Sequence, residues 1–118
     1  MRSVYALVLI VVVILFHDSN VEGLRPGGLT SVRDATPEVQ AVADAIRTEL
    51  ESRSETIFDE YVAVQYATQV VAGLNYFIKV HVGHNDYVHL RVFKSLKGDL
   101  SLASYKLGLT SADPLTYF

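Results

Sequence analysis

The apolar residues of this chain change their spacing near residue 57, and this change limits the fold more than any other feature. Before it, a set of apolar residues recurs at helical spacing and would share one face of a helix. After it, apolar and polar residues alternate, as they do along strands buried on one side. A chain of 118 residues has room for one domain, so helix and strands must share a core. The apolar face of the helix consists of Val39, Val42, Ala43, Ile46 and Leu50.

The predicted helix has a sharp beginning. Thr36 can act as the N-cap, and Pro37 suits the first helical position, where its missing N–H costs nothing. Glu38 then favours the positive end of the helix dipole. We expect the helix to end near Arg53.

The strand signals follow in regular order. The first segment is rich in β-branched and aromatic residues, and the next two alternate between apolar and polar residues. Glycine and aspartate mark the turns between them. We expect strands at residues 61–70, 74–82, 88–93 and 100–106, turns at 83–86 and 97–99, and a looser stretch after residue 108.

Neither the helix nor the sheet can bury its apolar side alone, so the helix should lie across one sheet face. The sequence therefore predicts an α+β fold, with one long helix packed across a four- to five-stranded antiparallel sheet. In this arrangement His81 and His89 occupy polar strand positions and should face solvent, as should His84 in its turn. Three solvated histidines near Asp86 do not make a convincing ligand set, so no metal and no cofactor are expected.

The absence of cysteine excludes whole classes of structure and chemistry. There is no disulfide framework, no cysteine zinc site and no thiol nucleophile. A Ser-centred nucleophile elbow is also missing from the sequence, so an enzyme is not expected. Stability must come from apolar burial and the hydrogen-bonded sheet.

Residues 5–16 form an unbroken run of 12 apolar residues, with Arg2 before it and polar residues after it. This is the plan of a secretory signal peptide, and the run is short for a membrane-spanning helix. We expect cleavage before Leu24, a secreted domain over residues 24–118, and no stable membrane span; an uncleaved anchor is the alternative. The remaining 9 basic and 11 acidic residues are scattered, which argues against nucleic acid as a partner. Residues 24–35 carry Pro26, Gly27 and Gly28, show no periodicity, and are expected to form an extended, mobile arm.

Several segments together resemble a known family. Gln69-Val70-Val71-Ala72-Gly73 is similar to the QxVxG signature of the cystatin superfamily. The stretch Pro26-Gly27-Gly28-Leu29, residues 35–38, residues 88–96 and the closing residues 115–118 resemble segments of stefins, the cysteine-free cystatins. Two features depart from the stefin pattern: stefins are usually cytosolic without a signal peptide, and Lys97 stands where a proline is usual, in a shorter second loop.

The resemblance implies a reversible, competitive inhibitor of papain-like (cathepsin-type) cysteine proteases. It would fill the active-site cleft with a wedge made of the N-terminal arm and two hairpin loops. It also implies a monomer that can exchange its helix and first strand to form a dimer, by straightening the first loop. The protease-binding residues that it implies are Pro26 and Gly27 in the arm, Gln69, Val70, Val71, Ala72 and Gly73 in the first loop, and Leu96 in the second.

Plainer interpretations remain for several of these residues. Val70 and Val71 could belong to a strand core, Gly27 and Gly28 could be linker glycines, and Leu96 could be core beside a turn; for Gly27 the functional interpretation is favoured. The competing function is a cystatin-fold protein that does not inhibit and serves as a binding or structural protein.

Overall fold

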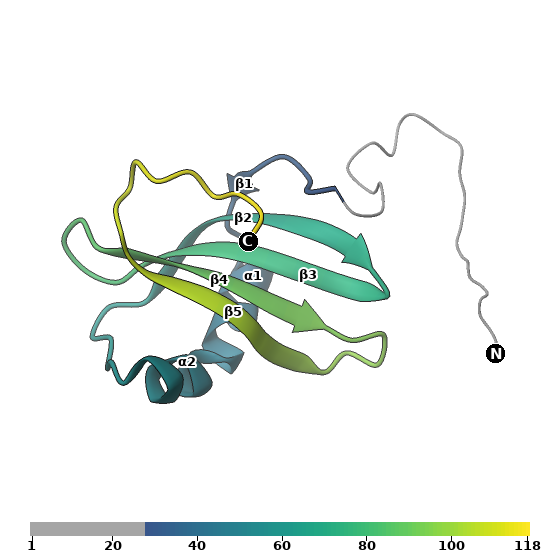
Figure 1. The fold of residues 1–118 in the computed structure, drawn as a ribbon, viewed down its shortest axis with the longest axis horizontal. Helices are drawn as coiled ribbons and strands as arrows, with labels where there is room; N and C mark the ends of the chain where they lie inside the picture. Colours follow the sequence, from purple (N-terminus) through teal and green to yellow (C-terminus); the bar gives the residue numbers. More distant parts are fainter. Residues whose placement is uncertain (1–27) are drawn as a thin grey trace.

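The computed structural model describes residues 28–118, and these form one layer of helix, one sheet and a covering C-terminal tail (Figure 1). Pro26, Gly27 and the predicted signal peptide lie outside the described residues. The elements in order are β1 (Arg33–Asp34), α1 (Pro37–Ala45), α2 (Arg47–Ser54), β2 (Val62–Val71), β3 (Gly73–His81), β4 (Tyr87–Lys94) and β5 (Leu100–Leu109).

The sheet has five strands in the order β1-β2-β3-β4-β5, and every neighbouring pair is antiparallel. The predicted α+β fold is therefore confirmed. The four long strands begin within two residues of their predicted positions, because turn residues and alternation mark them clearly in the sequence. The last strand continues to Leu109, three residues beyond its predicted end, and the looser stretch follows it.

The expected long helix is divided at Ile46, where the backbone leaves helical geometry with φ −105° and ψ 5°. The predicted N-cap is confirmed: Thr36 Oγ1 accepts a hydrogen bond from the Val39 N–H at 3.2 Å. The division has a packing consequence, since α1 contacts β2 and β4 while α2 contacts β5. The bend lets Ile46 and Leu50 both stay buried.

The first face of the sheet carries the main core. All five residues of the predicted helical stripe are buried there, against alternate residues of the strands. Tyr61 anchors this core to the helix, because its hydroxyl donates to the Ala43 carbonyl oxygen at 2.9 Å. Burial raises the pKa of the Tyr61 hydroxyl, so it remains a donor. The strand residues of this core are Ala63, Tyr76, Ile78, Val80, Val88, Leu90, Val92 and Leu102.

The second face of the sheet is also covered, which the sequence did not predict. A C-terminal tail (residues 110–118) crosses it, while α1 lies behind the sheet (Figure 1). Phe77 is fully buried under the tail, with Tyr117 and Phe118 at ring-centroid distances of 5.6 and 5.8 Å. Lys79 Nζ donates to the Ser111 carbonyl oxygen at 3.1 Å. The strand alternation is real, but both sets of side chains are buried along the middle of β3.

The tail also overturns the expectation that His89 faces solvent. This residue is only 3 % exposed, and its Nε2 has no hydrogen-bond partner among residues 28–118. Burial, together with the charge of Lys79, lowers the pKa of His89 to about 4, with Lys106 adding to the effect and Asp113 opposing it. The error arose because alternation cannot reveal a face that is covered by a distant segment of the chain. His84 is exposed, as expected, and His81 is half-buried.

The prediction of a mobile arm is also wrong for residues 28–35, the part of the arm that the structure describes. Thr30 N donates to the Thr68 carbonyl oxygen at 2.9 Å and Ala35 N to the Val64 carbonyl oxygen at 3.0 Å. Arg33–Asp34 then pairs with Tyr66 and Gln65 as β1. Residues 28–35 are thus held as an edge segment of the sheet instead of a mobile arm. Backbone pairing of this kind needs no particular side-chain pattern, so the sequence carries little signal for it.

The buried His89 predicts a loss of stability in acid. The pKa of this histidine is lower in the folded state than in the unfolded state. It therefore makes its full contribution to the free energy of unfolding at pH values above 6.5, the pKa of the unfolded state. That contribution is lost as the pH falls toward about 4, and the total amounts to about 3 kcal/mol. Urea unfolding of the purified protein between pH 7.5 and pH 4 measures it. In His89→Gln this part of the pH dependence should disappear; an unchanged acid slope would contradict the assignment.

Candidate functional site

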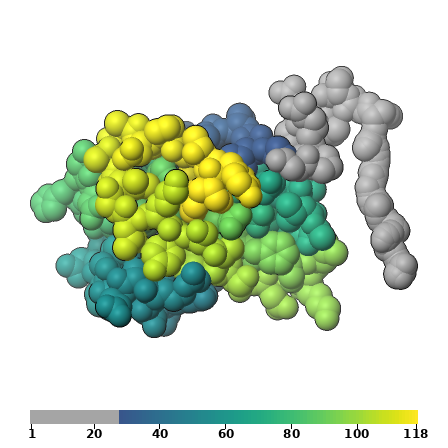
Figure 2. Space-filling model, in the orientation of Figure 1, coloured from purple at the N-terminus to yellow at the C-terminus, as the bar shows by residue number. Residues whose placement is uncertain are grey.

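Three segments that are distant in sequence meet at one end of the sheet, which we call the loop end. They are residues 28–30 ahead of β1, the β2–β3 turn around Ala72, and the β4–β5 loop at residues 95–99. Figures 1 and 2 show the β2–β3 and β4–β5 turns side by side at this end, close to where the described chain begins. The antiparallel order of the strands requires this, because the β2–β3 and β4–β5 connections must both fall at the same end.

The first loop is as tight as a hairpin allows. β2 runs to Val71 and β3 starts at Gly73, so only Ala72 stands between them. Val71 is 39 % exposed and Ala72 is exposed, whereas Val70 is half-buried. The exposed pair makes a small apolar tip. The strand-core interpretation is therefore wrong for Val71 and partly right for Val70.

Gly73 is required by the backbone and by its surroundings. Its φ of +126° lies in a region that other residues rarely adopt. A Cβ atom at this position would stand 2.6 Å from the Lys94 carbonyl oxygen and 2.8 Å from Cε1 of Phe93. The first loop therefore rests directly on the end of β4, where the second loop begins.

Ser95 shapes the second loop. Its Oγ accepts hydrogen bonds from the backbone N–H groups of Lys97 and Asp99, at 3.2 and 3.1 Å. Its own backbone closes the loop, since Ser95 N donates to the Asp99 carbonyl oxygen at 2.8 Å. This network leaves Leu96 85 % exposed, the most exposed of the large apolar residues described. The interpretation of Leu96 as core beside a turn is wrong.

Gln69 differs from the other predicted site residues, because it is only 8 % exposed. Its Oε1 accepts a hydrogen bond from Asn75 Nδ2 at 2.9 Å, across the base of the hairpin. The predicted site residues 69–73 and Leu96 are thus brought to one end of the sheet, but Gln69 lies behind the tip. Pro26 and Gly27 fall outside the described residues, and their role stays a prediction.

Sequence reasoning missed the residues that support the tip. Asn75, Phe93 and Ser95 hold the two loops, yet none was singled out in advance. Asn75 could have been found: in a hairpin centred on Ala72, residues 69 and 75 stand opposite each other. The contact of Phe93 with Gly73 depends on the register between β3 and β4, which cannot be derived from the sequence.

The chemistry available at the loop end is that of a binding surface. Its exposed residues Val71, Ala72 and Leu96 are apolar, and the charged residues Lys97 and Asp99 are exposed beside Leu96 in the second loop. Within residues 28–118, no three His, Cys, Asp or Glu residues gather as a metal site would require. The described helices are also too short and polar to span a membrane.

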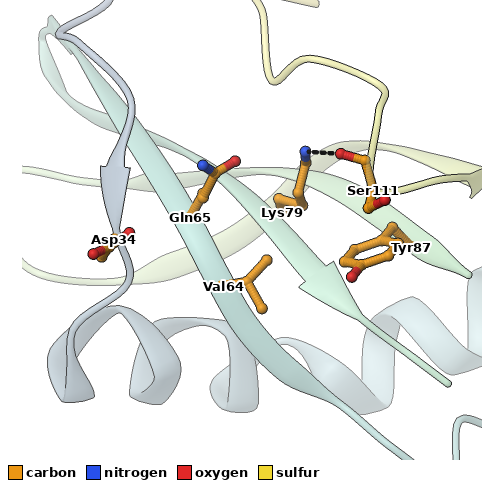
Figure 3. A pocket seen from close by; sticks show the side chains of 6 residues that line it. All are labelled: Asp34, Val64, Gln65, Lys79, Tyr87 and Ser111. Atoms are coloured by element: carbon orange, nitrogen blue, oxygen red, sulfur yellow. Dashed lines mark hydrogen bonds between the residues drawn. The ribbon is translucent and has the colours of Figure 1, made fainter. Parts of the chain in front are cut away.

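A shallow pocket lies elsewhere, on the tail-covered face. Figure 3 shows it between β1, β2 and the tail, with Lys79 bound to the Ser111 carbonyl oxygen at its rim. Its walls combine a buried lysine with the Asp34 carboxylate and the Tyr87 ring. It does not include any residue of the loop end. The lining residues are Asp34, Val64, Gln65, Lys79, Tyr87 and Ser111.

Comparison with known proteins gives consistent matches. Residues 27–112 match the cystatin domain. The chain is 48 % identical over 98 residues to Cystatin-A1 of Sus scrofa, covering 80 % of this chain and 95 % of that protein. It is 48 % identical over 96 residues to Cystatin-A of Homo sapiens, covering 79 % of this chain and 98 % of that protein. It is also 46 % identical over 100 residues to Leukocyte cysteine proteinase inhibitor 1 of Sus scrofa, covering 82 % and 97 %.

The geometry at Gly73 generates a stability prediction. Gly73→Ala should lower the free energy of unfolding by more than about 1 kcal/mol, because the strained φ and the close Lys94 carbonyl both oppose a methyl group. Gly98→Ala is the matched control: it also has positive φ, at +96°, but open space around it, so its loss should be smaller. Chemical denaturation compares the two. Equal losses would mean that the contact with β4 has no energetic weight.

Proposed function

This chain belongs to the cystatin family, and on that premise we propose that it inhibits papain-like cysteine proteases by inserting the loop end into their active-site cleft. The observation that carries the proposal is the pairing of an exposed apolar tip at Val71 and Ala72 with a second exposed apolar anchor at Leu96. Both stand at the loop end. They come from hairpins in contact with each other through Gly73.

The proposed mechanism is reversible and competitive. Apolar tips gain free energy when they leave water for the walls of a cleft. The loop end offers them on strands already fixed by the sheet, so little entropy is lost on docking. No peptide bond has to be placed for attack, and no nucleophile is needed. A dissociation constant near nanomolar corresponds to about −12 kcal/mol and is within reach of such a rigid surface.

The arm completes the proposed wedge. Leu24, Arg25 and Pro26 would occupy the subsites on the non-primed side of the cleft. Gly27 has no Cβ, so its backbone can pass close to the catalytic thiolate of a protease. The sheet supports this role in one respect: Leu29 pairs with Gln69, so the arm starts beside the first loop.

The cellular site and the assembly state are also proposals. The apolar run at residues 5–16 supports secretion after cleavage before Leu24, and the family match begins only at residue 27. We propose a monomer as the inhibitory form. Exchange of β1 to β2 between two copies would straighten the turn at Ala72 and bury the tip.

Inhibition of papain tests the proposal directly. The purified protein should block cleavage of a fluorogenic peptide competitively, with an inhibition constant near nanomolar. Val71→Asp and Leu96→Asp should each weaken inhibition at least about tenfold, because a charge must be desolvated in the cleft. Ile57→Asp is the matched control, since Ile57 is 77 % exposed in the α2–β2 connection and lies outside the loop end. No inhibition at micromolar protein would favour the alternative, a cystatin-fold binding or structural protein.

The arm is tested separately. Gly27→Arg should weaken inhibition of papain by about a hundredfold or more, because its side chain collides with the cleft wall or deflects the arm. Thermal stability should stay nearly unchanged. Ile57→Arg adds the same charge outside the loop end and controls for it. If stability and inhibition fall together in Gly27→Arg, the glycine is structural and this role fails.

A further inference from the structure

The three segments of the loop end stand on one shared row of residues, which we call the base row. It is the row of paired residues directly below the two loops, and it crosses from the arm to β5. Each neighbouring pair is a backbone partner in the sheet, with the arm joined by an isolated bridge. The base row consists of Leu29, Gln69, Asn75, Phe93 and Ser101.

One side-chain hydrogen bond ties the centre of the base row together. Asn75 Nδ2 donates to Gln69 Oε1 at 2.9 Å, from β3 to β2. The two residues enclose a tip of five residues, 70–74, with only Ala72 outside the strands. The bond therefore closes the hairpin at the last point where both strands are still held by neighbours on either side.

Gln69 is badly placed for direct contact with a protease. It is 8 % exposed, against 39 % for Val71 and 85 % for Leu96. The backbone of residues 29–30 lies along the edge of β2 at this point, since Leu29 bridges to Gln69 and Thr30 N donates to the carbonyl oxygen of Thr68. A buried amide group lowers the stability of the fold unless it is hydrogen-bonded.

We propose that Gln69 and Asn75 act as one positioning pair, which sets the direction of the Val71–Ala72 tip and does not itself bind the protease. This inference rests on the proposed function and deepens it, because it changes the role of Gln69 from contact to support. Loss of either amide breaks this cross-strand bond beside the buried Gln69, which loosens the base of the hairpin. The tip then samples other directions, and the fraction that fits the cleft falls.

A double-mutant cycle on papain inhibition tests the pairing. Gln69→Leu and Asn75→Leu should each raise the inhibition constant by roughly tenfold, the range expected when a buried hydrogen bond is broken. The double variant should be no worse than either single one, because the two groups act as a unit. Asn85→Leu is the matched control: Asn85 loses a bond to Ser111 N at 3.1 Å in the β3–β4 turn, and inhibition should not change.

A measurement without protease separates positioning from contact. Amide hydrogen exchange of residues 70–73 should speed up in Asn75→Leu and Gln69→Leu, while exchange in the middle of β4 stays slow. Asn75→Ser, whose short hydroxyl cannot reach Gln69, serves if the leucine variants fold poorly. If the unchanged protein does not inhibit papain, the proposed function fails, and the exchange data still test the pair.

Two results would overturn the inference. Inhibition and exchange that are both unchanged in Asn75→Leu and Asn75→Ser would show that the pair supports nothing. A Gln69→Leu variant far weaker than Asn75→Leu, with normal exchange at the tip, would show that Gln69 binds the protease directly.

Discussion

The rest of the structure depends on a sheet that is buried on both faces without any covalent cross-link. The chain has no cysteine, so α1 and α2 on one face and the tail on the other must hold the strands. Phe77 in β3 shows the constraint best, since it is completely buried although its strand neighbours Tyr76 and Ile78 already face the helices. A central strand packed on both sides cannot twist freely, so the loops at its end are also held in place.

Rigidity at the loop end is what an inhibitor of this kind needs. A wedge gains little from flexible apolar residues, because ordering them on binding costs free energy. Here a single residue joins β2 to β3, a glycine sets the first loop against β4, and the Ser95 hydroxyl closes the second loop. The exposed residues Val71, Ala72 and Leu96 are therefore carried by one rigid unit. The tail-face pocket and the buried His89 lie on other parts of the sheet, and His89 is predicted to lower stability in acid.

Local patterns predicted most of the fold. The cap at Thr36, the stripe from Val39 to Leu50 and the four long strands were each marked by residues that act within a turn or two. The bend at Ile46, the pairing of residues 28–35 and the cover over His89 were missed, because each arises from contact with a distant segment. For the site, the sequence grouped residues 69–73 with Leu96, and only the structure shows that Gln69 is buried while Val71 and Leu96 are exposed.

The sequence by itself determined the fold class, the order of the elements and the positions of the turns, because periodicity, capping and glycine act over a few residues. It also carried the resemblance through which the loops were recognised. Only the tertiary structure decided which residues of those loops are exposed and which support them. Register across strands and the path of the tail set that division, and both depend on contacts between segments that are distant along the chain.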